Sequence, residues 1–356
     1  MAVNALKVTI QPAGTCHLDC RYSYSVPDSP KTLAPDVPRH ALEASAAYVA
    51  GRGFDGLHCV WPGGEPILAG IRRFEQVFPA ASELALPLRH FVRTNALLLD
   101  DDYCRLFRDA EVCVGIGIDG PREIHDAFRV SLGGAPAHWL VMDAIALLGK
   151  HGVLFGCAAV VSRARLGRAQ EVYGFFRALG SGFRIRPVIP GRHSLDPACQ
   201  VERAEYGAAL LRFFDAWIAP DPVPVNVSPL DSYVAAAASG EPAECPRQQS
   251  CADGTLGIKS DGTATIRGRF RDTPPGRLGS SSAAELPAAP TCAAWQARTS
   301  LLKACHACVN WPICNGGCPH NALAFGLERT ARDPFCPACK AVLAHIRAAL
   351  GAGATV

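Results

Sequence analysis

Two cysteines near the start of the sequence have the spacing of metal ligands, and a serine stands where a third ligand is expected. Cys16, Cys20 and Ser23 share one segment, which follows an alternating, strand-like stretch at residues 6–10. Thiolates grouped on a loop beyond the carboxyl end of a strand are typical ligands of an iron–sulfur cluster. A serine hydroxyl ionises far less readily than a thiol, so Ser23 is not an equal replacement. The alternative interpretation is that Cys16 and Cys20 merely fill the loop.

The composition argues against several other classes of function. The chain has 356 residues, 16 cysteines and a formal net charge of +3, which is enough for one large domain and a smaller one. The charges are mixed, without a basic run or stripe, so we expect no nucleic-acid partner. No apolar run approaches the roughly 18 residues of a membrane span, and no signal segment is visible, so we expect a cytoplasmic protein with no membrane partner. Clustered cysteines in such a chain more often bind metal than form disulfides.

The first 190 residues alternate between strand-like and helix-like stretches. Strands are expected at residues 7–11, 56–61, 88–93, 112–118, 153–161 and 183–188. Amphipathic helices are expected at residues 39–51, 71–84, 101–109, 137–150 and 169–179. This alternation predicts an α/β fold with a parallel sheet covered by helices, and six strand–helix units fit a partial (β/α)6 TIM-like barrel.

Polar or glycine-rich residues follow five of these strands. After the cysteine loop they are Gly63-Gly64-Glu65-Pro66, Thr94-Asn95, Asp119-Gly120 and Ser162. In a barrel of parallel strands these positions converge at one end, where active sites lie. Turn chemistry could explain any single one of them, but five together predict a site. The paired glycines would let a ligand approach the main chain closely.

These motifs resemble those of radical S-adenosylmethionine (SAM) enzymes, in the sulfatase-maturase-like branch that also carries a SPASM domain. In that family a C-x3-C-x-aromatic-C loop holds a four-iron four-sulfur cluster, and the loop that here reads Gly63-Gly64-Glu65-Pro66 binds the amino group of SAM. The resemblance places Tyr22 beside the adenine and Ser162 near the ribose, and it includes Asn95 and Asp119 among the cofactor-binding residues. It covers residues 5–190.

The segment after residue 190 changes to Pro, Gly and Ala-rich composition, which predicts a bridge to a second domain. A helix is expected at residues 203–218. Further on, the resemblance aligns Asp231 with the carboxylate proposed as the catalytic base of sulfatase maturases. An Asp in a closed cavity can have a raised pKa and act as a base, but Asp231 could equally be a helix N-cap.

The last third of the chain has the densest cysteine spacing, C-x2-C-x5-C-x3-C from Cys305 to Cys318, with further cysteines on both sides. It resembles a SPASM domain, which supplies eight ligand positions for two auxiliary [4Fe-4S] clusters. By that resemblance one cluster is held by Cys305, Cys308, Cys314 and Cys336. The other is held in part by Cys245, Cys251 and Cys318.

The eighth position falls on Arg267, five residues after Gly262 in a hairpin that matches the family's. A guanidinium is cationic and cannot replace a thiolate. Structural zinc is the alternative for this cysteine array, because C-x2-C pairs also suit tetrahedral sulfur sites. The remaining cysteines are expected in the core, as small hydrophobes, at Cys59, Cys104, Cys113, Cys157 and Cys199; Cys292 and Cys339 stay undecided.

Three domains are therefore expected: a radical SAM barrel at residues 1–190, a bridge at 191–240 and a SPASM domain at 241–356. The resemblance implies an enzyme that modifies a side chain of a peptide or protein through a 5'-deoxyadenosyl radical, with SAM, [4Fe-4S] clusters and an electron donor such as flavodoxin or ferredoxin. Ser23 argues against activity of the chain as written. Two alternatives remain open: a pseudoenzyme that acts as a peptide-binding scaffold or chaperone, and a zinc-stabilised binding protein.

Overall fold

The structure is a computed structural model of the whole chain. It describes residues 5–23, 32–50, 53–190, 197, 199–219, 224–242, 255–260, 263–266, 276–277, 298–328 and 330–351.

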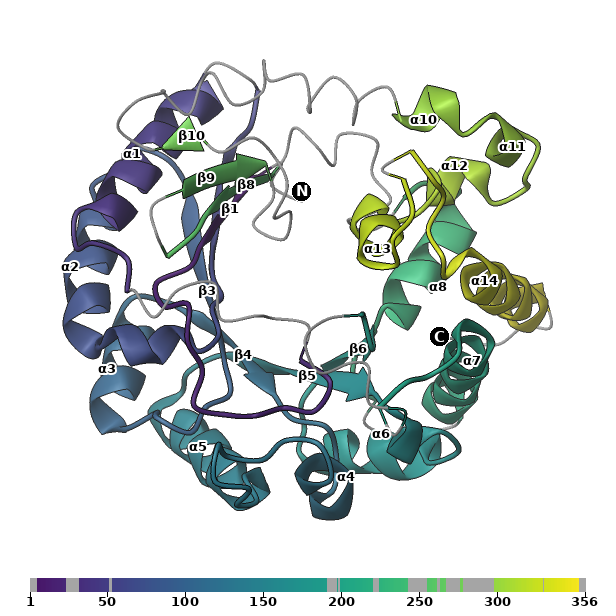
Figure 1. The fold of residues 1–356 in the computed structure, drawn as a ribbon, viewed down its shortest axis with the longest axis horizontal. Helices are drawn as coiled ribbons and strands as arrows, with labels where there is room; N and C mark the ends of the chain where they lie inside the picture. The colour runs from purple at the N-terminus through teal and green to yellow at the C-terminus, as the bar shows by residue number, and fades with distance from the viewer. Residues whose placement is uncertain are drawn as a thin grey trace.

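One sheet of ten strands forms the inner layer of the fold, in the order β10-β9-β8-β1-β2-β3-β4-β5-β6-β7 (Figure 1). The six strands predicted from the sequence are all present, namely β1 (Ala5–Ile10), β2 (Gly56–Trp61), β3 (Leu88–Thr94), β4 (Cys113–Gly117), β5 (Phe155–Val161) and β6 (Phe183–Pro187). Each pairs in parallel with the next. The sheet curves without closing, which confirms the predicted partial barrel.

Four further strands extend this sheet beyond the predicted six. β7 (Val227–Ser228) pairs in parallel with β6, and β8 (Thr255–Ile258) pairs in parallel with β1. β9 (Thr263–Ile266) and β10 (Gly276–Arg277) continue the sheet in antiparallel pairs. The hairpin that the family resemblance predicted is thus β8–β9, and it lies at the edge of the barrel sheet itself. The domain boundaries at residues 190 and 240 remain predictions.

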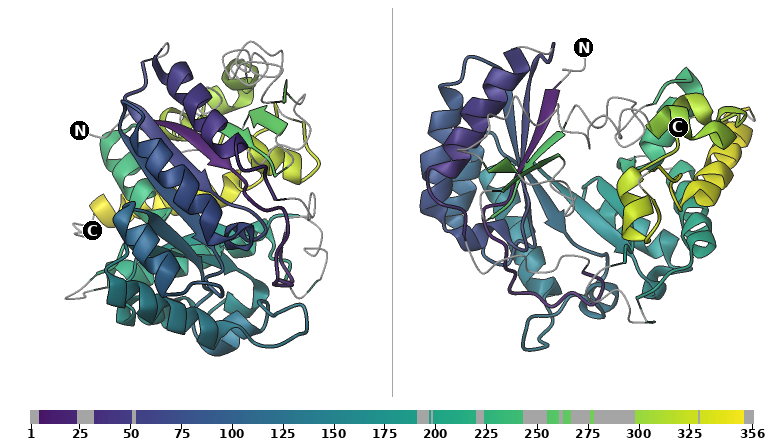
Figure 2. Two further views of the ribbon diagram at one scale, coloured as in Figure 1. Left: turned by 90° about the vertical axis from the view of Figure 1, so that its left-hand side faces the viewer. Right: turned by 45° about the horizontal axis from the view of Figure 1, so that its top comes forward.

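Helices cover the outer face of the sheet, as Figures 1 and 2 show. Those of the barrel are α1 (Val37–Ala50), η1 (Pro66–Ala69), α2 (Ile71–Ser82), α3 (Asp101–Asp109), α4 (Arg122–Asp126), α5 (His138–His151), η2 (Arg163–Arg165) and α6 (Ala169–Ala178). The later part of the chain adds α7 (Arg203–Ile218) and α8 (Leu230–Ser239), and then a C-terminal group that does not cover the sheet, made of α10 (Arg298–Leu301), α11 (Lys303–His306), α12 (Trp311–Cys314), α13 (Pro319–Ala324) and α14 (Cys336–Gly351).

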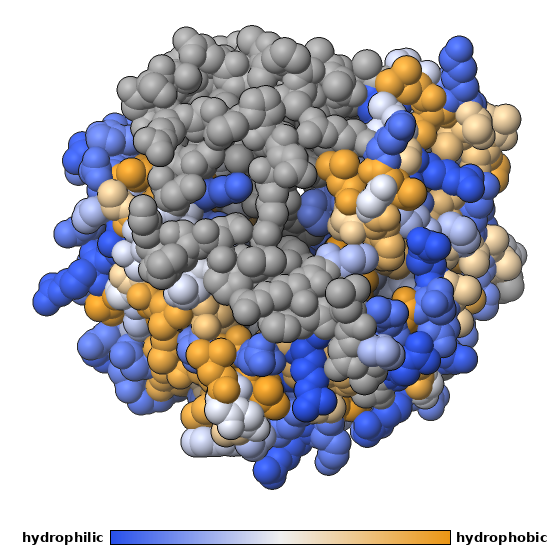
Figure 3. Space-filling view, in the orientation of Figure 1, coloured by the Kyte–Doolittle hydropathy of each residue, from blue (hydrophilic) through white to orange (hydrophobic). Residues whose placement is uncertain are grey.

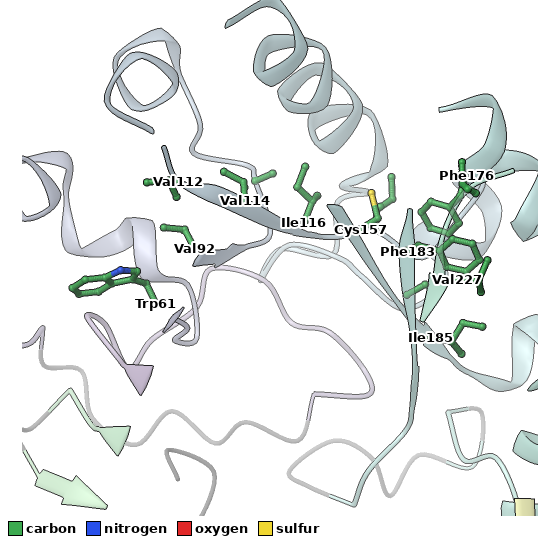
Figure 4. Packing of buried hydrophobic residues seen from close by; sticks show 14 of the residues in the cluster. Trp61, Val92, Val112, Val114, Ile116, Cys157, Phe176, Phe183, Ile185 and Val227 are labelled. Atoms are coloured by element: carbon green, nitrogen blue, oxygen red, sulfur yellow. The ribbon is translucent and has the colours of Figure 1, made fainter. Parts of the chain in front are cut away.

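The core lies between the sheet and its helices (Figure 4). In β1 the buried side chains are Leu6, Val8 and Ile10, each 0% exposed, whereas the residues between them are only half buried. A parallel strand buried on both faces would be apolar throughout. The alternation therefore shows that only the outer face of β1 packs against the apolar core, and that its inner face is left for other contacts.

The C-terminal helices are anchored on α7. Gly207 lies so close to α14 that an added Cβ would be 3.0 Å from the Cβ of Ala338. Tyr206 meets Phe335 edge to face at 5.2 Å, and the His345 ring lies 2.7 Å from the Asp215 carboxylate. The first residue of α14 is Cys336, so this packing ties a predicted cluster ligand to the barrel.

Two observations concern the surface. On the face seen in Figure 3, hydrophobic residues gather over the C-terminal helices, where Leu301, Val309 and Leu327 are 56%, 78% and 44% exposed. Within the residues that the structure describes, no helix is long and apolar enough to cross a membrane.

Candidate functional site

The cysteine loop lies directly against the Gly63-Gly64-Glu65-Pro66 segment. The Glu65 amide donates a hydrogen bond to the Thr15 carbonyl oxygen at 2.8 Å. An added Cβ on Gly64 would be 2.3 Å from that same oxygen, and one on Gly63 would be 2.6 Å from the Ala13 carbonyl oxygen. The close approach that the paired glycines allow is therefore made by the chain's own loop. The motif fixes the position of Cys16.

Cys16 and Cys20 are free thiols, each partly buried. The Cys16 sulfur accepts hydrogen bonds from the Leu18 amide at 3.4 Å and from the Asn95 side-chain amide at 3.7 Å. Burial raises the pKa of Cys16, and it raises the pKa of Cys20 to about 11. Without a metal, the protein thus favours the protonated thiol form of both cysteines over the thiolate form. A metal must displace these protons to bind. Asn95, which was predicted to bind the cofactor, contacts the predicted cluster ligand Cys16, and its cofactor role stays a prediction.

Ser23 ends this loop, and its amide donates to the Cys20 carbonyl oxygen at 2.8 Å. The backbone therefore keeps Ser23 beside Cys20, as the ligand pattern requires. The donor set at this position is two thiols and one hydroxyl, which fits a four-iron cluster only in part, because such clusters are held by cysteine.

Glu65 is a buried carboxylate that joins two loops. Its side chain accepts hydrogen bonds from the Thr94 hydroxyl at 2.7 Å, the Asn95 amide at 2.8 Å and the Ile67 amide at 3.1 Å. Burial raises the pKa of Glu65 to about 7, against the lowering effect of these donors. Because both oxygens have protein partners, Glu65 positions the loops after β2 and β3. Pro66 follows it at the start of η1.

Asp119 is the centre of a second buried network at the same edge of the sheet. Its carboxylate accepts a hydrogen bond from the Tyr22 hydroxyl, and it pairs with Arg129 at 3.1 Å and Arg165 at 2.7 Å. The Val160 amide donates to it at 3.0 Å. Although burial opposes ionisation, the two guanidinium groups hold the pKa of Asp119 well below its usual value. Tyr22 and Asp119, which were both predicted to bind the cofactor, are thus hydrogen-bonded to each other.

The two arginines of this network were missed by the sequence analysis. The Arg165 side chain is 0% exposed, and its Nε and Nη1 atoms have no hydrogen-bond partner among the residues that the structure describes. Arg129 lies over the Tyr22 ring at 5.4 Å. Two guanidinium groups face one carboxylate, so the network carries an excess positive charge in a buried place. Such a site favours an anionic group as a further neighbour.

Ser162 and Asp231 lie at the carboxyl ends of β5 and β7. Ser162 is 1% exposed, and its carbonyl oxygen accepts from the Arg165 amide at 3.0 Å. Asp231 lies in the first turn of α8, where Pro229 is the N-cap, and its carboxylate accepts from the Ser232 amide at 2.6 Å. Because β7 is parallel to β6, Asp231 follows its strand at the same edge of the sheet as the other site residues. The N-cap alternative for Asp231 is wrong.

Five of the predicted auxiliary ligands are described, form no disulfide and are partly buried, namely Cys305, Cys308, Cys314, Cys318 and Cys336. Burial raises the pKa of Cys336, and negative charge on Cys314 and Cys305 raises it further. A set of thiols only is the donor chemistry that an iron–sulfur cluster requires. Cys245, Cys251, Arg267 and Cys292 lie outside the described residues.

Among the described residues, no three His, Cys, Asp or Glu side chains converge closely enough to hold a single metal ion. A four-iron cluster places each thiolate on a different iron, which spaces the ligands more widely than one ion does. The described cysteines therefore lend no support to the zinc alternative.

The other described cysteines do not all lie in the main core, and Cys113, which was predicted there, is only half buried because it lies on the opposite face of β4 from the buried Val114 and Ile116. Cys59, Cys104 and Cys157 are buried in the main core, as predicted, and Cys339 joins them there. Cys199 is also buried, but it packs in a separate small cluster with Tyr22 and Phe128, against which Cys20 lies. Only the fold reveals that proximity, because nearly 180 residues separate Cys199 from Cys20 in the sequence.

An open barrel of parallel strands with cysteines on the loop after its first strand is what the resemblance to radical SAM enzymes implies. No family model matches the chain. It is 26% identical over 272 residues to a serine-type anaerobic sulfatase-maturating enzyme of Bacteroides thetaiotaomicron. The aligned region covers 69% of this chain and 65% of that protein. It is 25% identical over 332 residues to the serine-type anaerobic sulfatase-maturating enzyme of Klebsiella pneumoniae. Here the aligned region covers 90% of this chain and 84% of that protein.

A solved structure, native anSMEcpe with bound AdoMet and the Cp18Cys peptide, has the same fold. The TM-score is 0.85 at 20% sequence identity, and the match covers 98% of this chain and 99% of that one. The resemblance inferred from the motifs is thereby confirmed: the chain is a homologue of the anaerobic sulfatase-maturating enzymes and has the fold of this radical SAM group.

Proposed function

We propose that this protein is a radical SAM enzyme that modifies a side chain of a peptide or protein. The observation that carries the proposal is the contact of the loop that carries Cys16 and Cys20, made at Thr15 and Cys16, with Gly64 and Glu65 at the carboxyl edge of the sheet. Its homologues are named for sulfatase maturation, and a structure of the same fold holds AdoMet and a peptide. When bound and reduced, the cluster would cleave SAM and supply a radical that removes a hydrogen atom from the substrate.

The chain's own residues would hold the cofactor at this edge. Cys16 and Cys20 would ligate the cluster, while Gly63 to Pro66 keep the cysteine loop in place. The excess positive charge at Arg129 and Arg165 suits the carboxylate of SAM. Asp119 pairs with both arginines and keeps them in position. Asp231 would accept a proton from the substrate side chain. An external one-electron donor, such as flavodoxin or ferredoxin, would be needed to reduce the cluster.

Ser23 determines how well this site works. With two thiolates in place of three, we expect the chain as written to hold the cluster weakly and to cleave SAM slowly. Replacing Ser23 by cysteine supplies the missing thiolate without adding volume to the loop beyond one sulfur for one oxygen.

The test compares the wild-type chain with Ser23→Cys after anaerobic reconstitution with iron and sulfide. We expect Ser23→Cys to bind about four more irons per chain and, after reduction with dithionite, to release more 5'-deoxyadenosine from SAM. A peptide that carries a sulfatase-type Cys or Ser target should then change mass. A Ser23→Cys protein that takes up the iron but leaves SAM intact would overturn the proposal in favour of the scaffold alternative.

A further inference from the structure

A buried arginine organises the loop between two of the auxiliary cysteines. Arg298 is 4% exposed, at the start of α10. Its Nη2 atom donates to the carbonyl oxygens of Gly316 at 3.0 Å and Ala331 at 2.7 Å. Its Nη1 atom lies 3.4 Å from the carbonyl oxygen of Asn315 and 3.3 Å from that of Gly317. One guanidinium thus binds all three residues that link Cys314 to Cys318.

This loop has an uncommon backbone conformation. Asn315, Gly316 and Gly317 all have positive φ angles, of 46°, 77° and 70°. The two glycines adopt this conformation without a Cβ clash, and asparagine tolerates it better than most residues. An added Cβ on Gly316 would be 2.2 Å from the Leu302 side chain, and one on Gly317 would be 2.5 Å from Asp333. The turn brings three carbonyl oxygens to one place, and the Arg298 cation stabilises them there.

Asp333 completes the arrangement from the other side. Its carboxylate accepts a hydrogen bond from the Cys318 amide at 2.7 Å, and its own amide donates to the Gly316 carbonyl oxygen at 2.9 Å. Its carbonyl oxygen accepts from the Cys336 amide at 2.9 Å. Arg298 and the Asp333 amide therefore bind the same Gly316 carbonyl oxygen. Together they fix the backbone next to Cys314, Cys318 and Cys336.

The guanidinium also carries charge toward the thiols. Within the described part of the chain, the buried Arg298 Nε atom has no hydrogen-bond partner. The Nη1 atom contacts the carbonyl oxygens of Asn315 and Gly317, which are the residues next to Cys314 and Cys318 in the chain. A cation with so little exposure is poorly screened by water. The potential of an iron–sulfur cluster depends on the charge and the hydrogen bonds around its sulfurs.

We propose that Arg298 is the positioning residue of the auxiliary cluster bound by Cys305, Cys308, Cys314 and Cys336, and that its charge raises the reduction potential of that cluster. The inference rests on the proposed function, because it assumes that these thiols bind a cluster. The positive charge favours the reduced form, which gains one electron, over the oxidised form. The carbonyl contacts fix the loop that follows Cys314 and, through Asp333, the backbone at Cys336.

The experiment uses the full chain with Cys16→Ala and Cys20→Ala, so that only the C-terminal cysteines can bind iron. In this background we compare Arg298, Arg298→Lys and Arg298→Gln. Arg332→Gln is the matched control, since Arg332 is exposed and lies near Cys336. The readouts are iron content, thermal melting, and the potential from titration with dithionite followed by electron paramagnetic resonance.

We expect Arg298→Gln to shift the potential to a more negative value and to lower the iron content. Arg298→Lys keeps the charge but lacks the planar fork, so it should lose iron while the cluster that remains keeps a potential near that of the parent. Arg332→Gln should change neither. Equal potentials and iron contents in all four proteins would overturn the inference alone. A parent protein that binds no iron would instead contradict the auxiliary-cluster part of the proposed function.

Discussion

The Glu65 amide donates to the Thr15 carbonyl oxygen at 2.8 Å, and this bond joins the loop after β2 to the loop that carries Cys16. Two segments about 50 residues apart in the sequence are thereby held as one surface at the carboxyl edge of the sheet. The geometry of the cysteine site depends on the segment beside it, and this dependence can be measured.

Gly64→Ala should separate the two loops. The new Cβ would lie 2.3 Å from the Thr15 carbonyl oxygen, so the cysteine loop must move. We expect a loss of roughly 1–3 kcal/mol in the free energy of unfolding and less iron at Cys16 and Cys20. Gly174→Ala in α6 is the matched control, because nothing lies within 4 Å of its added Cβ; there we expect unchanged iron content and a small gain in stability. Equal iron content in both variants would show that the contact is unimportant.

Glu65 should make stability depend on pH. Its pKa is about 7 in the folded protein and near 4.5 when unfolded, so the folded state binds more protons between these values. The contribution of Glu65 to the free energy of unfolding should therefore be largest below pH 4.5 and should fall by about 3 kcal/mol as the pH rises to about 7. Denaturant titrations across this range should show the fall in the wild-type chain. Glu65→Gln should be less stable but lack this component, and an identical slope in both proteins would contradict the assignment.

Asp119 and Arg165 should be strongly coupled. Asp119→Asn leaves two buried guanidinium groups without a counter-charge, which should cost about 3–5 kcal/mol. Arg165→Met removes the excess positive charge, so in the double variant the loss should be clearly smaller than the sum of the two single losses. Urea unfolding of the four proteins in the cycle gives the coupling energy. If the stability losses of the two single variants add up in the double variant, the ion pair between Asp119 and Arg165 at 2.7 Å makes no specific contribution to stability.

The sequence predicts the barrel well because its strands and helices have strong periodicity. Residues 101–109 were predicted as a helix and form α3 with those bounds. The pairing of Val227–Ser228 as β7 could not be foreseen, since two residues have no measurable period and their strand state depends on contact with β6. The pairing of β8 with β1 could not be foreseen either, because the two strands are far apart in the sequence.

The candidate site was predicted in part. The cysteines and the glycines stand in motifs, whereas the partners of Glu65 and Asp119 are set by the fold. Arg165 has Arg163 and Arg168 as close neighbours in sequence, and periodicity does not indicate which of the three is buried against Asp119. The same is true of Arg298, whose four carbonyl partners lie between 17 and 33 residues away.

The most direct measurement of the central claim is the iron bound at the barrel mouth. It compares Ser23→Cys with the same protein carrying Cys20→Ala, both reconstituted anaerobically and purified from unbound iron. If Cys16, Cys20 and residue 23 share one cluster, the first protein should contain about four more irons per chain than the second. Equal iron in the two proteins would contradict the account.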